Sequence, residues 1–125
     1  MIVDTHALSA IADAEAGVRD VVESAEIIAI PVVVLGEYRF GIIQSRWRAE
    51  YEKWLEDHLP ACLVLEVTAE TAATYAEVRL ELKRAGTPLP VNDTWIAALC
   101  RQYRLPILSR DEHFDLVKGV RRLSW

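Results

Sequence analysis

The chain has 125 residues, which is enough for one domain with one core, because domains usually run to ~100–200 residues. Hydrophobic residues make up 52% of the sequence and charged residues 26%, a globular composition that excludes a disordered or fibrous chain. The formal net charge of −5 excludes broad attraction to a polyanion, so any contact with nucleic acid must be local.

Short apolar or β-branched runs alternate with longer helical patterns along the chain. The runs predict buried strands at residues 1–3, 27–30, 62–65 and 106–108, with a fifth short strand near residues 121–124. The helical patterns lie between them, at residues 7–14, 18–24, 32–45, 48–58, 69–85 and 92–103. Strands joined by helical connections of this length pair in parallel. We therefore expect an α/β fold: one domain over residues 1–125, with a central mostly parallel sheet of four or five short strands and helices on both faces.

The sequence also indicates where the protein works. The longest apolar run, residues 27–35, contains Pro31 and is shorter than the ~20 residues that cross a bilayer, so no membrane span is expected. The N-terminal residues lack the basic segment of a secretory signal. Cys62 and Cys100 lack the spacing of a disulfide scaffold or a zinc site, and we interpret them as buried apolar groups. The expected location is cytoplasmic.

Acidic residues occupy the positions where an open parallel sheet builds its sites, beyond the carboxyl ends of the strands. Asp4 directly follows the first predicted strand, and Glu37 lies about two helical turns after the second. Asp93 begins the helix that leads to the fourth strand, and Asp111 stands three residues beyond that strand. All four side chains can therefore reach one edge of the sheet.

Taken singly, three of these acids have an ordinary structural explanation. Asp4 and Asp93 could cap helices, and Asp111 could be a turn or cap residue. Glu37 is harder to explain in this way, because nearly all of its neighbours are apolar and a buried carboxylate needs a compensating partner. Arg39, two residues away, points to another helix face and is a poor candidate for that partner.

Carboxylates that lie within a few ångströms of one another oppose folding unless a cation is present. Oxygen ligands without His or Cys companions select Mg²⁺ or Mn²⁺. The set predicts metal-assisted phosphodiester hydrolysis, in which the metal activates a water molecule and neutralises charge on the leaving oxygen.

Four blocks of the sequence, in this order, resemble the PIN-domain ribonucleases and, among them, the VapC-type toxins of toxin–antitoxin pairs. The blocks are IVDT at residues 2–5, VLGEYRFG at residues 34–41, NDTWIAA at residues 92–98 and ILSRDEHF at residues 107–114. The resemblance covers essentially the whole chain, and it implies a single PIN-like domain with a catalytic site that binds Mg²⁺ or Mn²⁺. The metal-binding acids that it implies are Asp4, Glu37, Asp93 and Asp111.

The resemblance also implies roles for residues beside the acids. Ser109 takes a catalytic hydroxyl position usually held by Thr, and Asn92 matches a polar neighbour of the third acid, so it is a candidate substrate contact. Arg110 is the candidate for contact with a substrate phosphate. Two positions depart from the family pattern: His6 replaces a common Ser or Asn, and His113 stands where the family often has another acid. We interpret both as structural hydrogen-bonding residues.

The function that the resemblance implies is an endoribonuclease toxin that leaves 5′-phosphate and 3′-hydroxyl ends. A cognate VapB-type antitoxin is the implied inhibitor, and a homodimer is the implied assembly. Trp47, Tyr51 and Trp54 form an aromatic stripe on one face of a predicted helix. This stripe either packs into the core or binds the antitoxin.

Two other classes of protein compete with this interpretation. A catalytically silent PIN-fold binding module would act through protein or RNA association, but retention of all four acids favours the enzyme. A phosphoaspartyl enzyme or receiver domain would also place an Asp after the first strand. It fits poorly, because the sequence lacks a second acid two residues after Asp4 and a Lys after the strand at residues 106–108.

Overall fold

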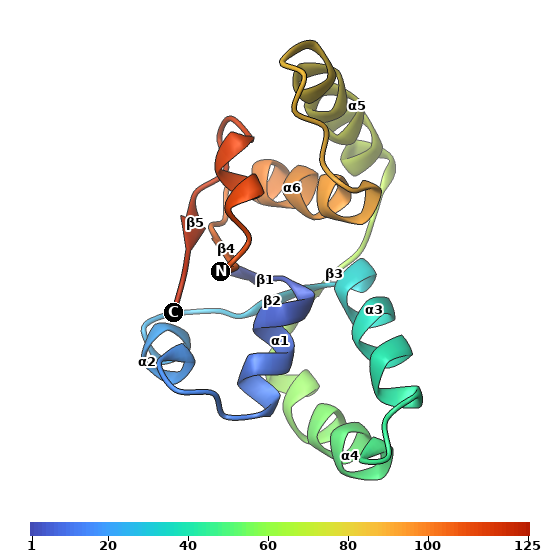
Figure 1. Ribbon diagram of the computed structural model, residues 1–125, viewed down its shortest axis with the longest axis vertical. Helices are drawn as coiled ribbons and strands as arrows, with labels where there is room; N and C mark the ends of the chain where they lie inside the picture. The colour runs from blue at the N-terminus through green and yellow to red at the C-terminus, as the bar shows by residue number, and fades with distance from the viewer.

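The computed structural model describes the whole chain, Met1–Trp125, and contains a five-stranded sheet in which every neighbouring pair of strands is parallel (Figure 1). The order across the sheet is β3-β2-β1-β4-β5. The α/β class and the parallel sheet predicted from the sequence are confirmed. The strands are β1 (Ile2–Val3), β2 (Ala29–Pro31), β3 (Leu63–Leu65), β4 (Ile107–Leu108) and β5 (Arg122–Leu123).

Six α-helices cover the two faces of this sheet. The chain runs from β1 to β3 in one direction and then crosses back to β4 and β5 on the other side of β1. Right-handed crossovers put the helices that follow such a reversal on the opposite face. In Figure 1, α1 to α4 lie below the sheet, and α5 and α6 lie above it. The helices are α1 (Thr5–Ala12), α2 (Val18–Glu23), α3 (Val32–Ile43), α4 (Arg48–His58), α5 (Ala69–Arg84) and α6 (Val91–Tyr103).

The reversal creates a topological switch point between β1 and β4. Ile2 pairs with Ile107 and Val3 pairs with Leu108, so the two strands end level with each other. In open parallel sheets, ligands bind in the crevice beyond the carboxyl ends of the strands at such a point. The residues that come next along the chain therefore enter the expected position of a site.

The core lies on both faces of β1 and β4. All four strand residues are completely buried, and residues 96–100 of α6 are buried against them. Because these strands are covered on both sides, they consist of consecutive apolar residues and show no alternation with polar ones. Cys100 belongs to this core, and burial raises the pKa of its thiol to about 12. No helix combines the length and the apolar character that a membrane span requires.

The boundaries of helices and strands differ from the predicted ones by at most two residues. The helix after β1 begins at Thr5, two residues earlier than predicted, because the Asp4 side chain caps it. Two short 3₁₀ helices, η1 (Leu59–Ala61) and η2 (Glu112–Leu116), were not predicted. The second of these matters for the site, because it follows Asp111 directly.

Candidate active site

Asp4 is held at the end of β1 by the helix that it caps. Its Oδ1 accepts a hydrogen bond from the backbone amide of Ala7 at 2.7 Å, and the residue is only 5% exposed. A carboxylate has two oxygens and about four lone-pair positions, so this cap leaves capacity for a metal ligand. The capping role and the metal-binding role that the sequence suggests are therefore compatible.

Glu37 lies on α3 and accepts hydrogen bonds from two residues far away in the sequence. Its Oε2 accepts from the Thr5 hydroxyl, and its Oε1 accepts from the side-chain amide of Asn92 at 2.6 Å. These bonds join α3 to the beginnings of α1 and α6. The half-buried carboxylate is thus held by two neutral donors, and Arg39 is not among its partners.

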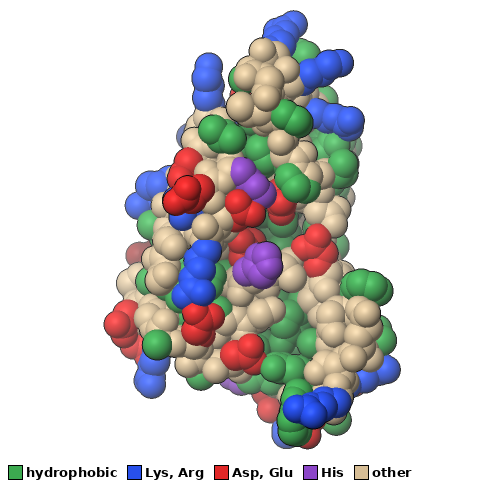
Figure 2. Space-filling model, in the orientation of Figure 1, with side chains coloured by type: hydrophobic (Ala, Val, Ile, Leu, Met, Phe, Trp, Pro, Cys, Tyr) green, Lys and Arg blue, Asp and Glu red, His purple; other side chains and the backbone are tan.

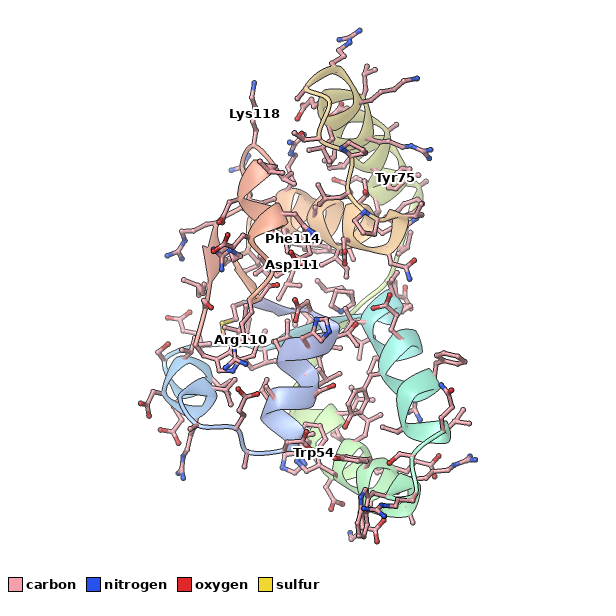
Figure 3. All side chains as sticks on the ribbon, in the orientation of Figure 1. Trp54, Tyr75, Arg110, Asp111, Phe114 and Lys118 are labelled. Carbon is pink, nitrogen blue, oxygen red and sulfur yellow. The ribbon has the colours of Figure 1, made fainter.

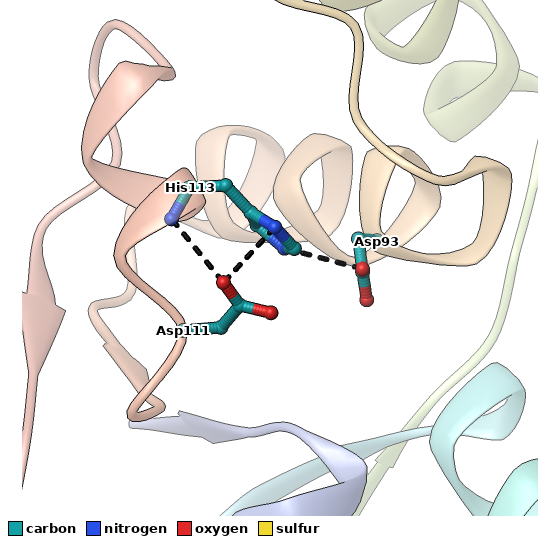
Figure 4. Close-up of side chains that lie close together, drawn as sticks. All are labelled: Asp93, Asp111 and His113. Atoms are coloured by element: carbon teal, nitrogen blue, oxygen red, sulfur yellow. Dashed lines mark hydrogen bonds and ion pairs between the residues drawn. The ribbon is translucent and has the colours of Figure 1, made fainter.

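His113 lies between two of the acids, as Figure 4 shows. Its Nδ1 is 3.0 Å from Oδ1 of Asp111, and its Nε2 is 3.2 Å from Oδ2 of Asp93; both are ion-pair contacts and neither has hydrogen-bond geometry. The backbone amide of His113 also donates to Asp111 at 3.3 Å. One ligand atom from each of the three side chains lies within 4.8 Å of the other two. This spacing is small enough for one metal ion to contact all three.

The acids at this edge of the sheet act on one another electrostatically. Burial raises the pKa of Asp93 above its usual value, and His113 opposes this shift. The negative charges of Glu37, Asp111 and Asp4 raise the pKa further. No Lys or Arg side chain forms an ion pair with any of the four acids. In Figure 2, acidic and His side chains gather at the middle of the face, and most Lys and Arg side chains lie toward its periphery.

Ser109 supports the backbone that carries Asp111. The side chain is completely buried, and its hydroxyl accepts a hydrogen bond from the backbone amide of Asp111 at 2.9 Å. Arg122 of β5 donates to the carbonyl of Ser109 at 3.2 Å and forms a bidentate ion pair with Asp115. Asp115 belongs to η2, so these contacts fix η2 against the end of the sheet.

Arg110 is not among the side chains that the structure brings to the acids. Its guanidinium pairs with Glu15 and lies 4.3 Å from the ring centroid of Trp125. Figure 3 shows Arg110 between α1 and α2, separate from Asp111. Asn92, by contrast, is exposed at the site and contacts Glu37.

The aromatic stripe of α4 has two different environments. Tyr51 and Trp54 are half-buried and pack against the core, and Trp54 stacks on His58 with 4.5 Å between ring centroids. Trp47, which precedes the helix, is 52% exposed. The core-packing interpretation therefore describes Tyr51 and Trp54, while Trp47 is available to a partner.

Two residues at the site have contacts that sequence reasoning did not assign. Thr5 belongs to the first motif block, but nothing in its spacing indicated a hydrogen bond to Glu37. His113 was interpreted as a structural hydrogen-bonding residue, whereas in the structure it bridges Asp93 and Asp111. The position of His113 in the sequence could have indicated these contacts, because the resembled family often has an acid there.

Two substitutions of Asp4 distinguish its role as a helix cap from the effect of its negative charge on stability. We expect Asp4→Ala to lower the free energy of unfolding by ~1 kcal/mol, because the N-cap of α1 is lost. We expect Asp4→Asn to be at least as stable as the wild type in metal-free buffer, because an amide oxygen keeps the cap and a repelling charge is removed. Urea denaturation of both variants measures the difference, and equal losses would contradict the role of the charge.

The parallel sheet and the acids at its switch point define an α/β domain with a carboxylate-rich candidate metal site. The family model for the PIN domain matches residues 1–120, and the chain belongs to the PIN-domain family. Ribonuclease VapC5 of Mycobacterium tuberculosis is 30% identical over 96 residues, which are 74% of this chain and 70% of the relative. Ribonuclease VapC4 of the same organism is 28% identical over 93 residues, 73% and 72% of the two chains. The domain is thus related to the VapC ribonuclease toxins.

Solved structures share the whole fold. VapBC2 of Rickettsia felis, bound to a DNA fragment from its promoter, gives a TM-score of 0.89 at 19% identity and covers 99% of this chain and 97% of that chain. DNA-bound VapBC of Salmonella typhimurium gives 0.87 at 22% identity, with 99% and 96% covered. A toxin–antitoxin complex from Klebsiella pneumoniae gives 0.77 at 20% identity, with 95% and 93% covered. The structural neighbours are therefore toxin–antitoxin complexes, and at these identities the likeness shows the fold.

Proposed function

We propose that this protein is a metal-dependent endoribonuclease toxin that hydrolyses RNA phosphodiester bonds at a carboxylate-bound Mg²⁺ or Mn²⁺ site. The observation that carries the proposal is the gathering of Asp4, Glu37, Asp93 and Asp111 at the switch point of the sheet without a Lys or Arg partner. The relation to VapC ribonucleases supports the same chemistry.

The donor set fits a hard divalent cation. The four acids offer carboxylate oxygens, which Mg²⁺ and Mn²⁺ prefer, and burial together with the neighbouring acids raises the pKa of Asp93. His113 adds a nitrogen ligand beside Asp93 and Asp111, so the set is not the all-oxygen one that the sequence predicted. Asp4, Glu37, Asp93 and Asp111 would hold the ion. When bound, the ion would supply a water molecule of lowered pKa and offset negative charge on the leaving oxygen.

The remaining contacts of the site hold the carboxylates in place. Thr5 and Asn92 fix both oxygens of Glu37. Ser109 fixes the backbone turn that carries Asp111. Groups that are oriented before the substrate arrives need no reorganisation during the reaction, so these bonds are positioning interactions in the proposed mechanism.

The proposal includes partners. RNA is the substrate, with Asn92 as a candidate contact; Arg110 is left out because it pairs with Glu15. A cognate VapB-type antitoxin would inhibit the enzyme, with the exposed Trp47 and the neighbouring Tyr51 and Trp54 as candidate contacts, and the toxin would act as a cytoplasmic homodimer. The toxin–antitoxin complexes among the structural neighbours support this assignment.

The direct test is to incubate the purified protein with total cellular RNA, with and without Mg²⁺, and to map new 5′ ends. We expect cleavage that depends on Mg²⁺, produces 5′-phosphate ends and is absent with the Asp93→Asn variant. Intact RNA after incubation with the wild type and Mg²⁺ would favour the catalytically silent binding module instead. Equal cleavage by both proteins would show that the assigned acids are not the active site.

A further inference from the structure

A groove extends from the acid cluster between α1 and α3, with a cavity of about 200 Å³, and Tyr38, Ile42 and Tyr51 are part of its lining. Figure 2 shows this hollow below the acidic patch. Its walls are two stripes of residues spaced four apart, which places each stripe on one side of its helix. We call it the α1–α3 groove; the stripes are Thr5, Ser9 and Asp13 on one wall and Glu37, Gly41 and Ser45 on the other.

The inner end of the α1–α3 groove is part of the candidate active site. Thr5 and Glu37 line the groove, and the same two residues are hydrogen-bonded to each other beside the other acids. A substrate whose phosphate lies at the acids would therefore place an adjacent group in the groove. The cavity has room for a single ring system, since a cavity of ~150 Å³ accepts a benzene molecule.

The far end of the groove contains a buried hydroxyl that lacks a partner. Tyr38 is only 4% exposed, and its hydroxyl has no hydrogen bond. Burial raises the pKa of Tyr38 to about 12, with Asp13 and Tyr51 adding to the shift, so the three groups lie close together. Tyr51 donates to Asp13 at 2.7 Å. An unpaired buried hydroxyl is unfavourable, and a polar ligand group at this end would satisfy it.

The charges of the groove select the chemistry of its ligand. Carboxylates lie at both ends, Glu37 and Asp13, and no Lys or Arg lines the cavity. A phosphate would be repelled, whereas N–H donors would be attracted. An apolar segment of a protein partner would leave these polar groups unpaired on burial. A planar ring with several N–H donors fits the groove best.

We propose that the α1–α3 groove binds the nucleobase next to the scissile phosphate and selects guanine, whose N1–H and exocyclic amino group can donate together to the Asp13 carboxylate. This inference rests on the proposed ribonuclease function. It makes Asp13 a specificity-determining residue at the end of the groove remote from the metal-binding acids.

Cleavage of an RNA pool of random sequence tests the proposal, with the bases on both sides of each cut read by sequencing. The wild type with Mg²⁺ is expected to favour guanine at one flanking position by about tenfold, the discrimination of a bidentate base contact. Asp13→Asn is expected to lose this preference. A wild type that cuts without base preference, or an Asp13→Asn variant that retains the preference, would overturn the inference about the groove but not the proposed ribonuclease function. No cleavage by the wild type would overturn the proposed function as well.

A pair of glycines on α3 supplies a matched steric control. A Cβ at Gly41 or at Gly36 meets no atom within 4 Å, so either change to Ala leaves the fold unstrained, but only Gly41 lines the groove. We expect Gly41→Ala to cut guanine-flanked sites several-fold more slowly than Gly36→Ala. Equal rates would overturn the proposal.

Discussion

Asp93→Asn is expected to lower Mg²⁺-dependent RNA cleavage by at least ~100-fold, the usual effect of removing one group that stabilises the charge of a transition state. The substitution keeps the size of the side chain and replaces a carboxylate ligand by a poorer amide ligand. Initial rates of cleavage of a short fluorescent RNA at saturating Mg²⁺ measure the loss.

The same variant is expected to be more stable than the wild type without metal. Because burial and the neighbouring acids raise the pKa of Asp93, its ionised form is disfavoured in the folded state. The penalty appears as the pH rises from the ordinary pKa of 3.8 through the raised value, and it is complete above that value. Urea denaturation at pH 7 should therefore show a higher midpoint for Asp93→Asn, and the difference should vanish below the ordinary pKa.

The exposed Asp20 of α2 provides the control, because it forms no ion pair and lies outside the site. Asp20→Asn should cleave RNA like the wild type and show no gain in stability. A loss of cleavage in Asp93→Asn together with a loss of stability would indicate a damaged fold and would contradict the electrostatic explanation.

Phe114→Ala is expected to lower the free energy of unfolding by about 3–5 kcal/mol, the usual cost of removing a large side chain from a core. Phe114 is 1% exposed and joins η2 to the core (Figure 3). Because η2 carries His113 and follows Asp111, the variant should also cleave RNA more slowly even where it remains folded. Chemical denaturation and cleavage assays at low temperature measure the two effects.

Leu116 is the matched control for this substitution. It lies at the other end of η2 and is 53% exposed, so Leu116→Ala should change stability by no more than about 0.5 kcal/mol. If both variants lost the same stability, burial of Phe114 would not be what anchors η2.

The fold could be predicted because its signals are local. The first four strands lie in short apolar runs, and the lengths of the connections between them favour parallel pairing. The order of the strands was not predicted, because strands of two or three residues carry no information about which neighbour they pair with. That order depends on crossovers that reverse direction after β3. The strand predicted at residues 62–65 is an edge strand, and its Leu63 and Val64 are exposed, not buried as expected.

The positions of the acids could be predicted for the same reason, since each follows a strand or begins a helix. The contacts that the acids make could not be predicted. Glu37 receives its hydrogen bonds from residues 32 and 55 positions away, and no local spacing encodes such pairs. The bridge made by His113 depends on η2, whose anchor is the packing of Phe114.

Arg110 was expected at the site because it is next to Asp111 in the sequence, but the two side chains lie in different places. The strand β4 ends at Leu108, and Arg110 lies in a bend, so neighbouring side chains here need not point to the same place. The structure agrees, because Ser109 contacts Asp111 and Arg110 contacts Glu15. Adjacency to a site residue therefore did not place Arg110 in the site.

The proposed function requires that the gathered carboxylates form one site for a divalent cation. Isothermal titration of Mn²⁺ into the metal-free protein at pH 7 tests this claim most directly, with Asp93→Asn and Asp20→Asn titrated in parallel. We expect saturable binding to the wild type and to Asp20→Asn, and binding at least ~10-fold weaker to Asp93→Asn. Absence of binding to the wild type, or the same affinity for Asp93→Asn, would contradict this claim.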